Sequence, residues 1–295
     1  MGAKLCGVNL PPAQLTVTHS STVIEDQIDD LGHMNVRYYG MNAMSATRSM
    51  CQQMGFDEPK LRSAYTRHHH EQMLGNQLEV RSGLIGGSDR LRIYHELRNR
   101  ADNDLAATFV HELDHPSPDG PKVDLPDYGR PRSLRLETDG LASAPPLNEL
   151  IESGLAVRRP RTVDLEDTMG ADTVPTWLAN NLIWGGERLD EISEWVRTLP
   201  DGGRYAFVVM ESRLWVRPEP VPIGTPIQSF SATIEVGEKI ERDISWAYDT
   251  STGDVLAVIE GVDLCFDMTR RRSMVIPDQE RRKFTKEFRP DLAPR

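Results

Sequence analysis

The chain is 295 residues long, carries a formal net charge of -11 and has 38% hydrophobic residues. This length predicts two units of roughly 100 to 150 residues each, with enough apolar side chains for ordinary cores. The negative charge opposes binding to nucleic acid, and no window approaches the ~18 apolar residues of a membrane-spanning helix, so we expect neither nucleic-acid nor membrane partners.

The first residues and the cysteines bear on the location of the protein. Met1 to Cys6 contain no apolar run of the signal-peptide kind, so we expect a cytoplasmic protein. The cysteines are Cys6, Cys51 and Cys265, which are scattered and lack the spacing of a metal-binding pair. They support neither a disulfide framework nor a zinc site, and we expect them to be reduced.

The first unit begins with a predicted strand from Leu15 to Ile24, which is rich in Thr and Val. A polar loop carrying Asp29 and His33 follows this strand. Asn35 is suited to cap a helix, which apolar residues at helical spacing continue as far as Gly55. Three extended segments come next, at residues 77–85, 90–99 and 104–114. The predicted order is therefore strand, helix and antiparallel meander.

A long connector and a second unit with the same order follow. Residues 116–160 are rich in Pro, Gly, Asp and Arg and have little periodicity, which is typical of a surface connector. Pro175 suits the first turn of a long helix that contains Trp177, Leu182, Leu189, Ile192 and Trp195. Strands are predicted at residues 227–236, 239–249 and 254–267. The predicted boundaries are 12–115 for the first unit, 116–160 for the connector and 161–285 for the second unit.

The two units contain one pattern twice, and only the first copy keeps its polar residues. Residues 27–35 align with residues 165–173 without a gap. The aligned pairs, with the first copy named first, are Asp29 and Asp167, Gly32 and Gly170, His33 and Ala171, and Asn35 and Thr173. Because the second copy has lost the imidazole and the amide, the repeat predicts one working site, which lies in the first unit.

The segment from Ile28 to Tyr39, with the sequence IDDLGHMNVRYY, resembles the helix entry of hotdog-fold acyl-CoA thioesterases related to the 4-hydroxybenzoyl-CoA enzymes. The tandem arrangement is similar to the double-hotdog acyl-acyl-carrier-protein thioesterases. The resemblance implies an α+β fold, a tandem double hotdog in which each unit is a long helix wrapped by an antiparallel sheet. It also implies that the two sheets join, so that one chain imitates a dimer.

The resemblance has two departures that rank the candidate activities. Acyl-carrier-protein thioesterases usually place an Asn two residues after the motif Asp, where this chain has Leu31. Hotdog hydratases carry their Asp and His at a different spacing, around an Asn-Pro that this chain lacks. Both departures favour an acyl-CoA thioesterase over the carrier-protein enzyme and over enoyl-CoA hydration or dehydration.

Thioester hydrolysis needs a carboxylate as base or nucleophile, donors for the oxyanion and a neighbour that fixes the geometry. Asp29 is the predicted base or nucleophile, although a loop-capping Asp is the structural alternative. His33 is expected to bond the thioester oxygen or to orient a water. Gly32 allows close backbone approach, and the amides from Asn35 onward are expected to hold the oxyanion. Asn35 either caps the helix or steadies the site.

Glu71 is the second candidate carboxylate, because hotdog enzymes can present residues just before the glycine of this strand across the cleft. A solvated Glu is the alternative. The run His68 to His70 suggests metal binding, yet adjacent residues of an extended segment point to opposite faces, and no fixed acidic partner accompanies them. We therefore expect no metal and no cofactor.

The sequence thus predicts a thioesterase that hydrolyses an acyl-CoA to the free acid and CoA. The alternatives are an acyl-acyl-carrier-protein thioesterase and a noncatalytic module that binds acyl-CoA. Three arginine clusters, the last at residues 270–272, are expected to be solvated charge, with a phosphate-bearing ligand or carrier as the alternative. Exposed sheet edges predict a homodimer of two-unit chains.

Overall fold

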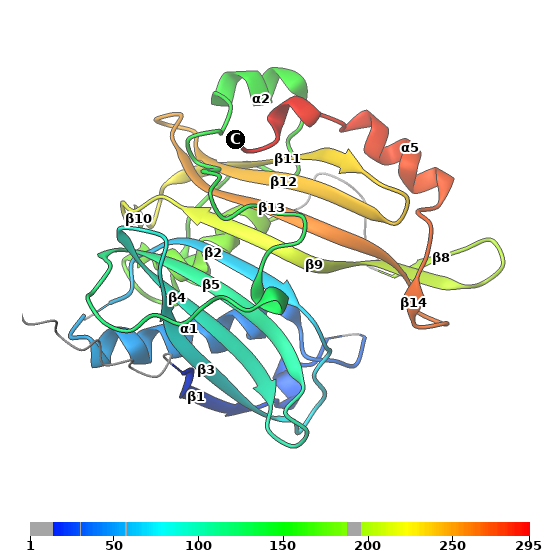
Figure 1. Cartoon of the computed structure of the whole chain (residues 1–295). Coiled ribbons are helices and arrows are strands. Elements are labelled where there is room, and N and C mark those ends of the chain that lie inside the picture. The colour runs from blue at the N-terminus through cyan, green and yellow to red at the C-terminus, as the bar shows by residue number, and fades with distance from the viewer. Residues whose placement is uncertain (1–13, 30, 57, 188–195) are drawn as a thin grey trace, which may run out of the picture.

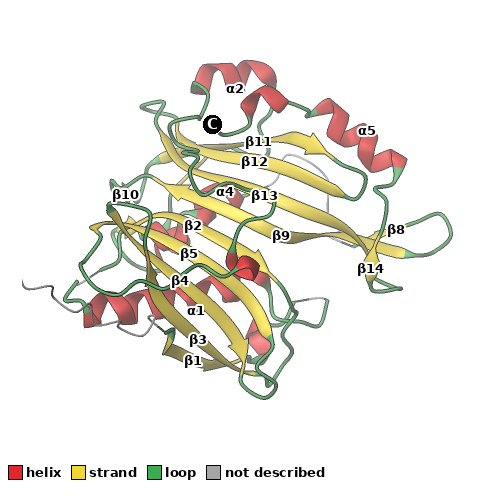
Figure 2. Cartoon of the chain, in the orientation of Figure 1, coloured by secondary structure: helices red, strands yellow, loops and turns green. Residues whose placement is uncertain are grey.

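The computed structural model describes residues 14–29, 31–56, 58–187 and 196–295. It is an α+β structure built on one antiparallel sheet of 12 strands, against which the helices lie (Figures 1 and 2). The main path through the sheet is β1-β3-β4-β5-β2-β9-β13-β12-β11-β6. Counted outward from the middle, its two halves have the same strand order, which agrees with the predicted duplication.

The first half of the sheet wraps the only long helix in the described part of the chain. Its elements are β1 (Thr16–Thr22), η1 (Glu25–Gln27), α1 (Val36–Gln53), β2 (Leu61–His68), β3 (Gln77–Ile85), β4 (Arg90–Asn99) and β5 (Leu105–Pro116). The predicted helix and the four predicted strands are all present. Buried Tyr39, Ala43 and Ala46 on α1 pack against the sheet, as their helical spacing predicts.

The prediction missed β2, which is a central strand. Every second side chain of β2 is buried, but the buried face includes the polar Ser63 and Arg67, so hydrophobicity does not alternate along it. Arg67 is tolerated there because its Nη1 donates to the carbonyl oxygen of Arg130 in the connector (3.0 Å). The partner that satisfies this buried arginine is therefore far away in the sequence.

The second half of the sheet comes from the C-terminal part of the chain. Its strands are β6 (Arg161–Thr162), β8 (Arg197–Thr198), β9 (Arg204–Val216), β11 (Pro226–Val236), β12 (Ile240–Asp249), β13 (Val255–Asp267) and β14 (Arg272–Ser273). A separate small sheet pairs β7 (Thr173–Val174) with β10 (Val221–Pro222). The predicted strands β11, β12 and β13 are present, whereas β9 was not predicted.

The two halves join through β2 and β9, which pair antiparallel from Ser63 with Trp215 to Arg67 with Glu211. Figure 1 shows these strands side by side in the middle of the sheet. Tyr65 Oη donates to Glu211 Oε2 across the same seam (3.2 Å). The joined sheet that the hotdog resemblance implies is therefore formed within one chain.

The long helix predicted for the second unit is not formed over its described part. The helical elements of this half are α3 (Leu165–Thr168), η3 (Thr176–Leu178), α4 (Asn180–Trp184), α5 (Asp278–Lys286) and η4 (Pro290–Leu292). The helix that contains Leu182 stops at Gly185, whose extended backbone is followed by Gly186 at φ +81°. Leu189, Ile192 and Trp195 lie outside the described residues.

The connector crosses the face of the sheet opposite α1, where it contacts both halves (Figure 1). It contains η2 (Asp127–Gly129) and α2 (Leu147–Ser153). Val123 and Leu134 are buried against Tyr94 of the first half, and Leu150 is buried against Trp246 of the second. A Cβ on Gly140 would lie 2.5 Å from the Trp215 ring, so only glycine allows this close approach.

A polar layer lies between α1 and the first half of the sheet. Thr47 Oγ1 lies 2.9 Å from His95 Nε2 and 2.8 Å from His111 Nδ1, and Ser82 Oγ lies 2.6 Å from His95 Nδ1. Burial lowers the pKa of His111 to about 4 and that of His95 well below its usual value. Both imidazoles are therefore neutral at pH 7, and hydrogen bonds make their burial tolerable.

Candidate active site

A tight loop before α1 brings the side chains of Asp29 and His33 together. The Asp29 amide donates to the His33 carbonyl (3.0 Å), and the Gly32 amide donates to the Asp29 carbonyl (2.9 Å). Gly32 has φ +85°, a left-handed conformation that favours glycine. The Leu31 amide donates to Asp29 Oδ1 (2.9 Å), so one carboxylate oxygen closes the loop and the other is available to His33.

His33 lies between two carboxylates. Its Nδ1 is 3.4 Å from Asp29 Oδ2, and its Nε2 is 3.7 Å from Glu71 Oε1. The side chains of His33, Asp29 and Glu71 are 13%, 22% and 35% exposed, so the imidazole is the most enclosed and Glu71 is the most open to solvent. The imidazole thus has a carboxylate near each ring nitrogen, an arrangement suited to proton transfer.

Two contacts hold the segment that carries Glu71 beside the entry of α1. The Met34 amide donates to the carbonyl oxygen of Gln72 (2.7 Å), next to Glu71 in the chain. Tyr39 Oη donates to the carbonyl oxygen of His70 (3.3 Å). Burial raises the pKa of Tyr39 to about 12, so its hydroxyl remains a donor at neutral pH. The residues on both sides of Glu71 are thus tied to the loop and to the helix.

The second half of the chain also reaches this site. The Arg271 guanidinium pairs with the Glu71 carboxylate through Nη2 and Oε2, although the two residues are 200 positions apart. Arg271 lies in the turn between β13 and β14. This contact was not predicted, and its only signal in the sequence is the arginine cluster at residues 270–272.

Within the described residues, no hydrogen bond or ion pair joins Asn35 to the other three predicted site residues. Its Oδ1 accepts from the Arg37 amide (3.1 Å), so its side chain caps α1. Its own amide donates to the Gln27 carbonyl (2.9 Å), which corrects the prediction that this amide is free for an oxyanion. The next amide, that of Val36, has no hydrogen bond within the described residues, and it lies at the positive end of the α1 dipole.

The three adjacent histidines have separate surroundings. The His68 ring packs edge-on against Tyr39 with centroids 5.1 Å apart, and burial lowers its pKa to about 4. His69 Nε2 lies 3.4 Å from Thr108 Oγ1, and His70 Nδ1 lies 3.6 Å from Asp104 Oδ2. Among the residues that the structure describes, no group of three or more His, Cys, Asp or Glu side chains is placed to hold a metal ion.

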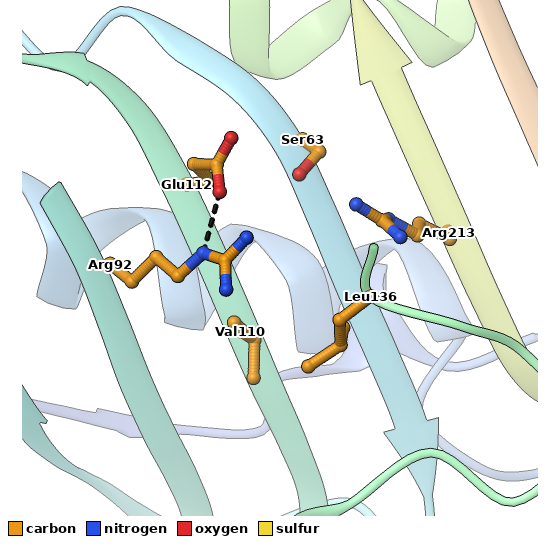
Figure 3. Close-up of a pocket in the computed structure, with 6 residues that line it drawn as sticks. All are labelled: Ser63, Arg92, Val110, Glu112, Leu136 and Arg213. Carbon is orange, nitrogen blue, oxygen red and sulfur yellow. Dashed lines mark hydrogen bonds and ion pairs between the residues drawn. The ribbon is translucent and has the colours of Figure 1, made fainter. Parts of the chain in front are cut away.

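A pocket on the opposite face of the sheet is not part of this site. Figure 3 shows Arg92, Glu112 and Arg213 lining it together with Leu136 of the connector. It is too narrow to admit a water molecule, and Arg92 Nε donates to Glu112 Oε2 across it (2.5 Å). Val110 faces this pocket, whereas its neighbour His111 faces α1, so the sheet separates the two places.

Comparison with known proteins agrees with the resemblance seen in the sequence. Residues 23–115 match the model of the Thioesterase-like superfamily. No curated protein matches the chain by sequence. Across the described residues, no helix is both long and apolar enough to span a membrane.

Three solved structures cover most of the chain. An acyl-ACP thioesterase from Bacteroides thetaiotaomicron is 11% identical with a TM-score of 0.57, covering 84% of this chain and 97% of that one. The 12:0-ACP thioesterase from Umbellularia californica is 10% identical with a TM-score of 0.54, covering 85% and 94%. A conserved hypothetical protein from Mycobacterium tuberculosis with a double hotdog fold is 12% identical with a TM-score of 0.50, covering 88% and 97%. At these identities the likeness demonstrates the fold, which is a double hotdog.

Proposed function

We propose that the protein is a thioesterase that hydrolyses acyl-CoA, and that Asp29, His33 and Glu71 form its active site. Thioester hydrolysis is the activity that the family match over residues 23–115 indicates. The observation that carries the site is the position of His33, which has Asp29 Oδ2 at 3.4 Å on one ring nitrogen and Glu71 Oε1 at 3.7 Å on the other.

Glu71 acts as the general base in this mechanism. A water held between His33 Nε2 and Glu71 Oε1 gives its proton to the carboxylate and attacks the thioester carbonyl carbon. The new C–O bond leaves a negative oxygen, for which the Val36 amide and the α1 dipole provide stabilisation. The C–S bond then breaks, and the CoA sulfur takes the proton that Glu71 had accepted.

Asp29 orients the imidazole rather than attacking the substrate. Its Oδ1 is already used by the Leu31 amide, whereas its Oδ2 faces His33 Nδ1. A carboxylate near Nδ1 favours the tautomer with the proton on Nδ1, which leaves Nε2 unprotonated and able to accept a hydrogen bond from the water. Asn35 supports the same loop by capping α1.

Thiol release from a panel of acyl-CoAs with short, long, aromatic and charged acyl groups tests this function. The native protein should release CoA thiol from at least one substrate. Tight acyl-CoA binding without any release would instead support a noncatalytic binding module. Following enoyl absorbance in parallel separates hydrolysis from hydration of the acyl chain.

Hydrolysis of acyl groups on a carrier protein is the second candidate. It is favoured by the two neighbours whose names describe ACP thioesterases, at TM-scores of 0.57 and 0.54. Leu31, in place of the Asn usual in that family, counts against it. The same acyl chain offered on CoA and on a carrier protein separates the candidates, because a carrier-protein enzyme should strongly prefer the carrier.

A further inference from the structure

We propose that Arg271 of the second unit is a positioning residue for the Glu71 carboxylate, so that the active site is complete only when both units are docked. This inference rests on the proposed thioesterase function. The second unit would then take part in arranging the active site, although it has lost the counterparts of His33 and Asn35.

The two oxygens of Glu71 have different partners. Oε2 pairs with Arg271 Nη2, and Oε1 lies 3.7 Å from His33 Nε2. A partly exposed Glu side chain has three rotatable bonds and samples several rotamers when nothing holds it. Pairing of Oε2 with a guanidinium selects the rotamer in which Oε1 faces the imidazole.

The turn that carries Arg271 is itself held in place. Asp267 Oδ1 accepts from the amides of Thr269 (3.0 Å) and Arg270 (2.8 Å), and its Oδ2 pairs with Arg270 Nη1 (2.9 Å). These bonds lower the pKa of Asp267, the Arg270 amide bond being the largest cause, so the carboxylate stays charged. Arg270 is thereby occupied within the turn, and Arg271 is the arginine that reaches the first unit.

The backbone of Arg271 supports the same conclusion. Its φ is +52°, in the left-handed region that most side chains avoid. The guanidinium carbon also lies 5.6 Å from the centre of the Phe266 ring, a cation–π contact. Glycine would adopt this backbone conformation with less strain. The position instead holds Arg271, whose guanidinium contacts both the Phe266 ring and the Glu71 carboxylate.

The alternative is an ordinary surface ion pair, since the Arg271 side chain is 52% exposed. Such pairs contribute little to stability, so unfolding measurements alone do not distinguish the two roles. Catalysis does distinguish them, because small displacements of a base relative to its water reduce turnover strongly.

The test compares Arg271→Met with Arg272→Met in the full chain. Arg272 lies in the same hairpin and makes no ion pair within the described residues, so its substitution removes the same charge without touching Glu71. We expect Arg271→Met to lower kcat about tenfold with little change in KM, and Arg271→Lys to restore most of the loss. Arg272→Met should leave kcat unchanged.

A double-mutant cycle with Glu71→Gln tests whether Arg271 affects turnover through Glu71. If Arg271 acts through Glu71, Arg271→Met should cause no further loss of turnover in the Glu71→Gln background. Equal losses in both backgrounds, or an unchanged kcat in Arg271→Met, would overturn the proposal. A higher KM for acyl-CoA at unchanged kcat would overturn it as well, and would identify Arg271 as a ligand for substrate phosphates.

A spectroscopic measurement separates this proposal from the proposed function. In protein labelled with ¹⁵N-histidine, the ring signals of His33 are identified by their absence in His33→Ala. Arg271→Met should move these signals and Arg272→Met should not, even if no thioester in the panel is hydrolysed. Unmoved His33 signals in both variants would contradict the proposal while leaving the thioesterase assignment intact.

Discussion

The two copies of the repeated loop carry an aligned carboxylate, Asp29 in the first and Asp167 in the second, and these two side chains have different partners. Gly32 and Gly170 have φ of +85° and +84°, so the loops share an unusual backbone position. In the second copy, however, Asp167 is locked by Arg161 through two bonds of 2.5 and 2.9 Å and accepts from the Asp164 amide (3.0 Å). In the first copy, Asp29 keeps one oxygen for an imidazole. The two loops thus share the left-handed glycine, while the aligned carboxylate is tied up by an arginine in the second copy and faces an imidazole in the first.

The two halves also differ in the polar side chains at equivalent positions of their sheets. In the first half, Ser82 and His95 are cross-strand partners, and His95 contacts Thr47 of α1. In the second half the equivalent partners are Ser231 and Ser245, whose hydroxyls bond each other (2.9 Å). The long helix and the buried histidines are thus features of the first unit only, among the residues that the structure describes.

The largest expected change in kcat comes from substitution of His33, whereas substitution at the aligned position 171 should not raise activity. His33→Ala should lower kcat by roughly 10²–10⁴-fold, because the residue that contacts both carboxylates is lost. Ala171→His should not raise activity, since Asp167 is already neutralised by Arg161. Steady-state thiol release by the two variants checks this prediction. A His33→Ala enzyme with native turnover would contradict the assignment.

A second prediction concerns stability rather than activity. Asp167→Asn should lower the free energy of unfolding by about 3 kcal/mol, because it leaves the partly buried Arg161 without its charged partner. Asp29→Asn should change stability far less while reducing turnover. Urea unfolding of both variants measures the difference, and equal destabilisation at the two positions would contradict a structural role for Asp167 that Asp29 lacks.

Much of this architecture is contained in the sequence, but the contacts that complete it are not. The strands at residues 77–85 and 90–99 were predicted at their observed bounds, because their flanking turns and apolar content are local signals. β2 and β9 were missed because pairing across the seam, rather than apolar alternation, stabilises them. The helix predicted for the second unit ends at Gly185 instead of continuing.

The candidate site was partly predictable for the same reason. Asp29 and His33 could be proposed because they lie on one short loop, and Glu71 because it precedes a recognisable strand. Arg271 was not found, because its contact with Glu71 joins positions 200 residues apart. The capping bond of Asn35 to the Arg37 amide could be expected from residue type alone.

The pH dependence of stability tests the buried histidines, which are found only in the first unit among the described residues. Burial lowers the folded-state pKa of His111 from 6.5 to about 4, so between these values the unfolded chain binds a proton that the folded protein does not. The free energy of unfolding should therefore fall as the pH falls from 6.5 to 4, by about 1.4 kcal/mol per pH unit for this residue. His111→Gln should remove this component, so the difference in unfolding free energy between native protein and variant should shrink with acid. A difference independent of pH would contradict it.

The smallest expected effect concerns the start of α1. Asn35→Ala should lower the free energy of unfolding by about 1 kcal/mol, because it removes the acceptor for the Arg37 amide. Asn35→Thr, which introduces the residue found at the aligned position 173, should retain most of that stability and most of the activity. Thermal unfolding and thiol release of both variants provide the check. A large loss of kcat in Asn35→Thr at native stability would mean that the Asn35 amide takes part in the chemistry.

The most direct test of the central claim is thiol release from acyl-CoA by native protein, Glu71→Gln and Asp167→Asn, at temperatures where all three are folded. One working site in the first unit predicts that Glu71→Gln loses roughly 10²–10⁴-fold in kcat while Asp167→Asn keeps native turnover. Native turnover in Glu71→Gln, or an equal loss in a folded Asp167→Asn, would contradict it.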